Sequence, residues 1–89
     1  MRVRLILTGK VQGVGFRQFA RVEADKNSVT GYVRNMPDGS VVIVGEADEL
    51  KLKKFVDACR RGPLISFVQD CKIEYKEGKN KYREFEVRF

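Results

Sequence analysis

The chain has 89 residues, 43% of them hydrophobic and 34% charged, which suffices for one modest core, so we expect a single domain over residues 1–89. It contains no histidine, and this excludes histidine general bases, Ser-His and Cys-His nucleophile pairs and histidine-ligated metal sites. The net charge of +6 favours an anionic partner, which charge alone leaves open as a phosphorylated metabolite, a nucleic acid or an acidic protein.

The first part of the chain predicts a strand, a glycine-containing loop and a helix. Apolar and polar residues alternate over residues 2–8, as in a strand, and we expect that strand to end near Gly9. Residues 10–16 read as a loop. Apolar residues then recur at helical spacing from Phe16, and the helix should stop near Asn27.

The middle of the chain predicts a hairpin and a second helix. Residues 29–35 are rich in β-branched and aromatic types, and Asp38-Gly39 marks a tight connection to a second strand. That strand, residues 40–46, is apolar enough to be central and buried on both faces. Asp48 is a good helix N-cap, and Gly62-Pro63 is a typical helix stop.

The last part predicts an extended segment over 66–75, a polar basic loop over 77–82 and a final strand over 85–89. The order is β-α-β-β-α-β with one additional strand. It predicts an α+β fold, a ferredoxin-like βαββαβ sandwich with two helices on one face of an antiparallel sheet and an extra C-terminal edge strand. Proteins with this topology have many different functions, so the function has to be inferred from the residues of the candidate site.

The loop before the first helix has the chemistry of a phosphate-binding site. Gly13 and Gly15 allow several backbone N–H groups to point into one concavity, the helix N-terminus adds partial positive charge, and Arg17 supplies a planar fork of donors. The loop is neither a Walker motif nor a dinucleotide fingerprint. The residues alone equally allow that the glycines only turn the chain and that Arg17 is a solvated helix residue.

Two longer motifs carry a family resemblance. Leu7-Thr8-Gly9-Lys10-Val11-Gln12-Gly13-Val14-Gly15-Phe16-Arg17 resembles the first signature of the acylphosphatase family, and Gly31-Tyr32-Val33-Arg34-Asn35-Met36-Pro37-Asp38-Gly39-Ser40-Val41 resembles the second. Both stand in the family's order and spacing. The resemblance implies a hydrolase that cleaves the carboxyl-phosphate bond of acyl phosphates to carboxylate and inorganic phosphate.

By this resemblance, the catalytic residues are Arg17 and Asn35. Arg17 matches the family's phosphate-binding arginine, and the backbone of Val14, Gly15 and Phe16 is expected to add phosphate contacts. Asn35 matches the asparagine that orients the attacking water, although the same residue could simply begin the turn that follows it. No metal, cofactor or covalent intermediate is expected, because the acyl phosphate already carries a good leaving group.

The chain departs from the family pattern at two places. Asn27-Ser28-Val29 stands where the family usually has Leu-Gly-Leu, which removes a helix C-cap glycine, costs about 1 kcal/mol and is expected to shift the end of the helix. Ala47 stands where a glycine usually closes the second signature. Neither position belongs to the proposed phosphate or water ligands, so these changes concern local geometry and stability.

The cellular setting is also predicted from the sequence. No apolar run is long enough to cross a bilayer and no signal peptide is evident, so we expect a cytoplasmic protein without a membrane partner. Cys59 and Cys71 have neither metal-ligand spacing nor the density of a disulfide scaffold, and are expected to be buried reduced thiols. The expected partner is a small acyl phosphate, and a monomer is the default.

Two alternatives stay open at this point. The first is a carbamoyl-phosphate-handling domain like those fused to hydrogenase-maturation proteins, which shares the site chemistry. The second is a non-catalytic anion- or RNA-binding module that uses the open face of the sheet. Residues 3–7 and 40–46 carry no aromatic side chain for base stacking, which argues against nucleic acid.

Overall fold

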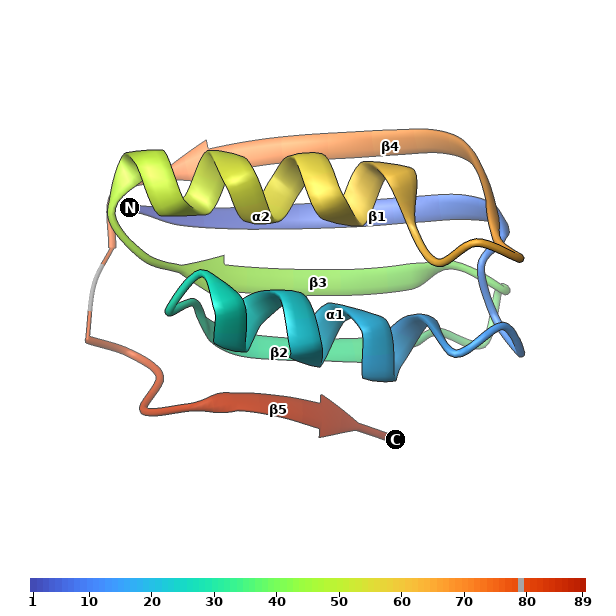
Figure 1. The fold of residues 1–89 in the computed structure, drawn as a ribbon, viewed down its shortest axis with the longest axis horizontal. Coiled ribbons are helices and arrows are strands. Elements are labelled where there is room, and N and C mark those ends of the chain that lie inside the picture. Colours follow the sequence, from blue (N-terminus) through green and yellow to red (C-terminus); the bar gives the residue numbers. More distant parts are fainter. Residues whose placement is uncertain (79) are drawn as a thin grey trace.

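The computed structural model describes residues 1–78 and 80–89 as a sheet of five strands with two helices packed on one face (Figure 1). The elements in chain order are β1 (Arg2–Lys10), α1 (Phe16–Lys26), β2 (Thr30–Asn35), β3 (Val41–Glu46), α2 (Glu49–Arg61), β4 (Phe67–Lys76) and β5 (Phe85–Arg88). The predicted element order and the ferredoxin-like sandwich are confirmed. The predicted loop over 77–82 includes Lys79, which lies outside the described residues.

The strands are arranged in the order β4-β1-β3-β2-β5. The first four strands are antiparallel to their neighbours, as predicted, but β5 pairs in parallel with β2, so the sheet is mixed. The reason is topological, because β4 ends at Lys76, at the end of the sheet where β2 begins with Thr30. A strand that enters the edge beside β2 from that end must run in the same direction as β2. The C-terminal ends of β2 and β5 therefore lie together.

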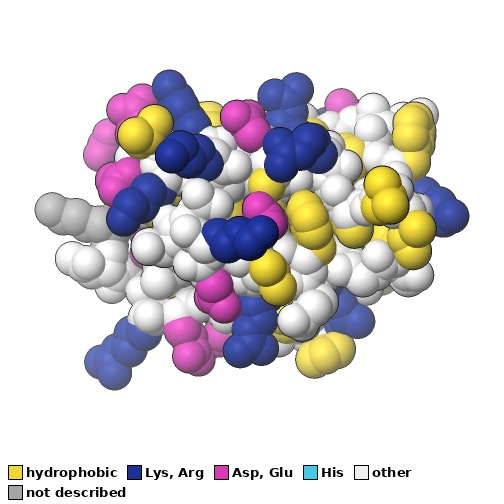
Figure 2. All heavy atoms as spheres, in the orientation of Figure 1, with side chains coloured by type: hydrophobic (Ala, Val, Ile, Leu, Met, Phe, Trp, Pro, Cys, Tyr) yellow, Lys and Arg dark blue, Asp and Glu magenta, His cyan; other side chains and the backbone are white. Residues whose placement is uncertain are grey.

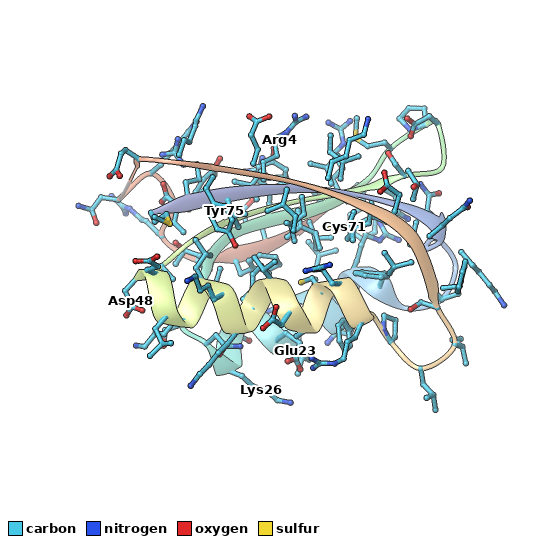
Figure 3. All side chains as sticks on the ribbon, turned by 90° about the horizontal axis from the view of Figure 1, so that it is seen from above. Arg4, Glu23, Lys26, Asp48, Cys71 and Tyr75 are labelled. Atoms are coloured by element: carbon cyan, nitrogen blue, oxygen red, sulfur yellow. The ribbon has the colours of Figure 1, made fainter. Side chains whose placement is uncertain are left out.

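The two faces of the sheet differ in what covers them. Val3, Leu5 and Leu7 of β1 are fully buried beneath the helices, whereas Arg4 between them is exposed on the open face (Figure 3). The helices contribute their apolar stripes, as their spacing predicts. The side chains that fill this core include Phe16, Ala20, Ala24, Val33, Ile43, Leu52, Phe55, Val56 and Cys59.

All six residues of β3 are buried, which confirms the predicted central strand. On the helix side Ile43 packs in the core. On the open side Val44 lies between Arg4 of β1 and Tyr32 of β2, whose longer side chains flank it. A strand with neighbours on both sides and side chains on both faces has no solvated surface, so the continuous apolar run is explained.

Strand β1 continues beyond its predicted end at Gly9. Its pairing with β4 changes register between Thr8 and Gly9, and Lys10 still pairs with Phe67. Gly9 has φ of 119°, and a Cβ there would collide with the carbonyl oxygen of Phe67. Glycine thus marks an irregularity inside the strand, where sequence reasoning took it for the strand's end.

The end of α1 is formed without a glycine. Ser28 adopts φ of 55°, the left-handed conformation that glycine normally takes after a helix. The N–H of Val29 donates to the carbonyl of Ala24 at 2.9 Å, and the N–H of Ser28 donates to the carbonyl of Asp25 at 3.4 Å. The helix thus ends at Lys26 with a serine in the left-handed position, and the cost falls on the backbone of Ser28.

The cap of α2 and the cysteines follow the sequence more closely. Asp48 accepts a hydrogen bond from the N–H of Lys51 at 3.0 Å, which confirms the predicted N-cap. Cys59 and Cys71 are both free thiols. Cys59 is buried, and burial raises the pKa of its thiol far above the usual range, whereas Cys71 is only partly buried, contrary to the prediction. No helix among the described residues is long and apolar enough to span a bilayer.

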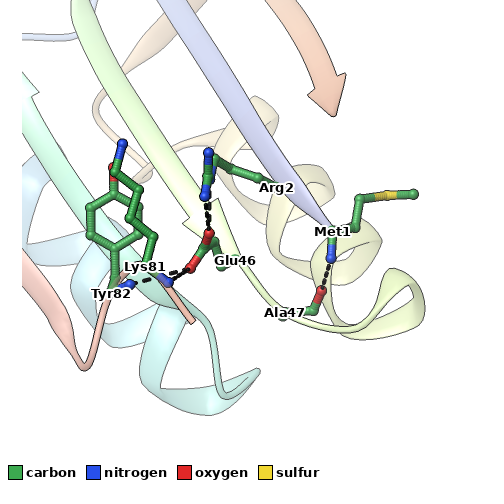
Figure 4. A network of polar contacts seen from close by, with 6 residues as sticks. All are labelled: Met1, Arg2, Glu46, Ala47, Lys81 and Tyr82. Carbon is green, nitrogen blue, oxygen red and sulfur yellow. Dashed lines mark hydrogen bonds and ion pairs between the residues drawn. The ribbon is translucent and has the colours of Figure 1, made fainter. Parts of the chain in front are cut away.

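Glu46 closes the end of the sheet at which β3 stops (Figure 4). Its carboxylate accepts a hydrogen bond from Arg2 Nε at 2.8 Å and others from the backbone N–H groups of Lys81 and Tyr82 at 3.1 and 3.3 Å. Burial by itself raises the pKa of Glu46, but these hydrogen bonds outweigh it and leave the pKa below its usual value. The buried carboxylate of Glu46 thus holds the segment before β5 against the sheet through hydrogen bonds to Lys81 and Tyr82.

Candidate active site

The loop between β1 and α1 is turned by two glycines with positive φ. Gly13 has φ of 73° and Gly15 has φ of 78°, both in the left-handed region. A Cβ on either residue would meet no heavy atom within 4 Å, so the backbone conformation and not crowding calls for glycine. Gly15 is also the N-cap of α1, and no side chain caps this helix end. The loop therefore brings bare backbone to the start of the helix.

Gln12 connects this loop to the β2–β3 turn. Its side-chain Nε2 donates to the carbonyl oxygens of Met36 and Ser40, each at 2.8 Å. The two carbonyls belong to the turn that follows Asn35, so one side chain fixes the distance between the loop and the end of β2. Sequence reasoning did not find this role, although Gln12 is part of the first motif.

The β2–β3 turn is held by its own hydrogen bonds as well. Asp38 Oδ1 accepts from the hydroxyl of Ser40 at 2.6 Å and from the N–H of Ser40 at 2.9 Å. These bonds lower the pKa of the Asp38 carboxyl. The N–H of Met36 also donates to the carbonyl of Ser40 at 2.8 Å. Asn35 is thus followed by a closed turn, which restricts the backbone that carries its side chain.

Arg17 and Asn35 meet at one cavity of about 270 Å³, at the end of the sheet where β2 and β5 stop. The cavity is lined by Val11, Gly13, Gly15, Phe16, Arg17, Gln18, Asn35, Val87 and Phe89. The Cζ atom of Arg17 lies 4.4 Å from the centre of the Phe89 ring, a cation–π contact. The cavity therefore joins the first loop, the end of β2 and the residues at the end of β5.

The backbone N–H groups at the end of this loop find no acceptor among the residues that the structure describes. Among residues 1–78 and 80–89, no hydrogen bond runs from the N–H groups of residues 13–17 to a protein oxygen. The first turn of α1 also carries no acidic side chain, whereas α2 begins with Glu49. Unpaired amides, a helix N-terminus and the guanidinium of Arg17 together favour a bound anion.

Among the described residues, the cavity has one ionisable side chain. Within the part of the chain that the structure describes, Arg17 is the sole ionisable residue among those lining the cavity, and Gln18 and Asn35 are its neutral polar side chains. In the same described part, no group of three Cys, Asp or Glu side chains is arranged to hold a metal ion. The site can thus bind and orient an anion through neutral donors and one fixed positive charge.

Most of the predicted site residues come together here. Gly15, Phe16, Arg17 and Asn35 all line the cavity. Val14 is not among the lining residues, because its side chain packs in the core. Sequence reasoning missed the contribution of Val87 and Phe89, since their place at the cavity depends on the parallel pairing of β5.

A larger hollow of about 400 Å³ lies at the opposite end of the sheet. It includes Glu46 and Asp48 among its lining residues. The carboxylate of Glu46 is already hydrogen-bonded to Arg2 and to two backbone N–H groups. Volume alone does not identify the site, since a third hollow, beside β5, reaches about 580 Å³. The unpaired donors favour the cavity at Arg17.

Comparisons with known proteins agree with the geometry. Residues 3–87 match the family model described as Acylphosphatase. The chain is 42% identical over 89 residues to the acylphosphatase of Bacillus licheniformis, covering 100% of this chain and 99% of the relative. The crystal structure of acylphosphatase from Bacillus subtilis superposes with a TM-score of 0.95 at 38% identity, covering 99% and 98% of the two chains. An acylphosphatase structure from Coxiella burnetii gives a TM-score of 0.90 at 29% identity over 98% and 90%.

Proposed function

Because the chain belongs to the acylphosphatase family of enzymes, which hydrolyse the carboxyl-phosphate bond of acyl phosphates, we propose that its reaction takes place in the cavity lined by Arg17 and Asn35. The products are a carboxylate and inorganic phosphate. These findings support neither the carbamoyl-phosphate alternative nor the RNA-binding alternative. The proposal rests on one observation: Arg17 and Asn35 line the same cavity as the β1–α1 loop with its unpaired backbone N–H groups.

Arg17 is proposed to bind the phosphoryl group. Its planar guanidinium can donate two parallel hydrogen bonds to phosphoryl oxygens, and the N–H groups of residues 14–17 can reach the others from the loop. In a loose transition state, charge redistributes over these oxygens, so fixed donors around them lower the barrier without moving. Lysine, with a single rotatable ammonium group, is a poor replacement.

Asn35 is proposed to hold the attacking water. The amide offers both an acceptor and a donor and cannot become charged, so it can orient a water opposite the leaving carboxylate. The turn that follows it is closed by Ser40 and tied to the loop by Gln12, which limits its movement. The proton of the water passes to a phosphoryl oxygen of the substrate, since no base lines the cavity in the described residues.

The mechanism is proposed to proceed without metal, cofactor or covalent intermediate. The acyl phosphate carries a good leaving group, so positioning and electrostatic stabilisation suffice for its hydrolysis. We also propose that the chain acts as a monomer in the cytoplasm. Both cysteines are free thiols, as in a reducing compartment. Sedimentation analysis of the purified chain tests the monomer.

The test is release of inorganic phosphate from benzoyl phosphate and acetyl phosphate by wild type, Arg17→Ala and Asn35→Ala. Removing one such donor is expected to lower kcat about 100- to 1,000-fold. Arg21→Ala is the matched control, because Arg21 is an exposed arginine one turn further along α1 and does not line the cavity. Full activity in Arg17→Ala or Asn35→Ala at matched folding would remove that residue from the mechanism. Loss of activity with a metal chelator would contradict the metal-free reaction.

A further inference from the structure

Phe89 is a highly exposed residue of the cavity wall. Its side chain is 90% exposed, and its ring lies 4.4 Å from the Cζ atom of Arg17. An exposed aromatic ring beside the proposed phosphate ligand is not explained by packing of the core. It is also not used by the hydrolytic mechanism, which requires only phosphate and water ligands.

The sheet determines where this ring lies. β5 pairs with β2 in parallel, with Val33 beside Val87 and Arg34 beside Arg88, so the next position brings Phe89 beside Asn35. Alternation along β5 turns Phe85, Val87 and Phe89 toward the helix side of the sheet. Phe85 is buried there and Val87 is partly buried. Phe89 is left exposed at the edge of the cavity.

Little of the apolar lining is available for contact with a ligand. Val11 is fully buried and Phe16 is 2% exposed, so neither offers surface to a group inside the cavity. Val87 and Phe89 are the other two apolar side chains that line it, and both keep exposed surface. Apolar contact with a substrate must therefore come from the end of β5, on the side where Arg17 lies.

We propose that Phe89 is a specificity-determining residue whose ring packs against the acyl group of the substrate while Arg17 holds the phosphate. The inference rests on the proposed function. An acyl phosphate with an aromatic or bulky apolar acyl group buries surface against Phe89 and Val87, whereas an acetyl group is too small to cover the ring. The chain therefore prefers aromatic acyl phosphates through contacts made outside the phosphate site.

The experiment compares kcat/KM for benzoyl phosphate with kcat/KM for acetyl phosphate in wild type, Phe89→Ala and Phe89→Tyr. We expect the ratio of the two values to fall about tenfold in Phe89→Ala and to stay near the wild-type ratio in Phe89→Tyr, which keeps the ring. Phe67→Ala is the control, because Phe67 is 64% exposed on β4 and does not line the cavity. Its ratio is expected to equal that of wild type.

Inhibition by inorganic phosphate separates two roles of the ring. If Phe89 only orients Arg17, Phe89→Ala weakens phosphate inhibition and lowers kcat/KM for both substrates by the same factor. This outcome overturns the inference. An unchanged ratio with unchanged phosphate inhibition overturns it too. A wild-type chain that hydrolyses neither substrate, or an Arg17→Ala variant with full activity, would remove the proposed function and this inference together.

Discussion

At one end of the sheet, the carboxylate of Glu46 accepts hydrogen bonds from Arg2, Lys81 and Tyr82, whereas at the other end the N–H groups of residues 13–17 find no acceptor among the described residues. Both ends are concave and both collect polar groups. The charge of the first is neutralised by the protein itself. At the second end, the N–H donors of residues 13–17 are left for a bound ligand.

The surface view shows a related contrast (Figure 2). Lysine and arginine side chains are interspersed with acidic ones over the helices, while hydrophobic side chains gather toward the end that carries the β1–α1 loop. Positive charge is therefore spread over this face and does not mark the site. What distinguishes the two ends is whether the polar groups are satisfied, since unsatisfied donors are rare in folded proteins and mark places built for a ligand.

The largest effect is expected from Arg17→Lys at the unsatisfied end. Lysine keeps the charge but loses the planar fork, so kcat/KM for benzoyl phosphate should fall about 100-fold or more. The free energy of unfolding should stay within about 0.5 kcal/mol of wild type, because Arg17 lies at the surface of the cavity. Steady-state kinetics and urea unfolding measure both quantities. Comparable activity in the lysine variant would show that charge alone suffices there.

Glu46→Gln tests the satisfied end. Losing the ionised acceptor of Arg2 is expected to lower the free energy of unfolding by about 2 kcal/mol, while kcat/KM stays within about twofold. Because the pKa of Glu46 is lowered in the folded state, its contribution is complete above the unfolded value of 4.5 and is lost as pH falls below it. Urea unfolding of wild type and Glu46→Gln between pH 3 and 7 should show that the difference in their free energy of unfolding shrinks toward acid, because a single carboxyl group becomes protonated. A difference that grew toward acid would contradict the assignment.

Gln12→Ala should affect both properties, because Gln12 joins the loop to the turn after Asn35. Removing its two hydrogen bonds is expected to lower the free energy of unfolding by about 1 kcal/mol and kcat/KM about tenfold. Gln69→Ala, an exposed glutamine on β4, is the control. An effect on stability without any effect on kcat/KM would show that the turn keeps its position without Gln12.

Ser28→Gly is expected to give the smallest effect, away from both ends. Glycine adopts the φ of 55° found at this position without strain, so the free energy of unfolding should rise by about 1 kcal/mol with unchanged kcat/KM. Ser28→Ala keeps the strain and should not stabilise the chain. Thermal unfolding of the two variants beside wild type tests this, and equal stabilisation by alanine would refute the backbone explanation.

Much of the fold follows from local patterns, because alternation and helical spacing reflect which face each residue buries. The apolar run of β3 and the cap at Asp48 are examples that the structure confirms. The direction of β5 is different, since it depends on where β4 ends in space. Gly9 is a second case, because the same residue type can end a strand or relieve a close approach within it.

The candidate site divides in the same way. The two motifs single out Arg17 and Asn35, and the cavity brings both side chains together, while their catalytic roles stay a prediction. Gln12 and Phe89 act across the fold, one through carbonyls of a distant turn and the other through the pairing of the last strand. Such contacts leave no periodic signal in the sequence, so only the coordinates reveal them.

The position of β5 after the other described elements determines when during synthesis it can join the sheet. Arg17 and Asn35 leave the ribosome early, but Val87 and Phe89 follow after every other element has emerged. Contacts between segments so distant along the chain form slowly, since a long stretch of backbone has to be ordered before they are gained. A nascent polypeptide that has not yet released β5 is therefore expected to lack the apolar wall of the cavity, even when its first four strands have already assembled.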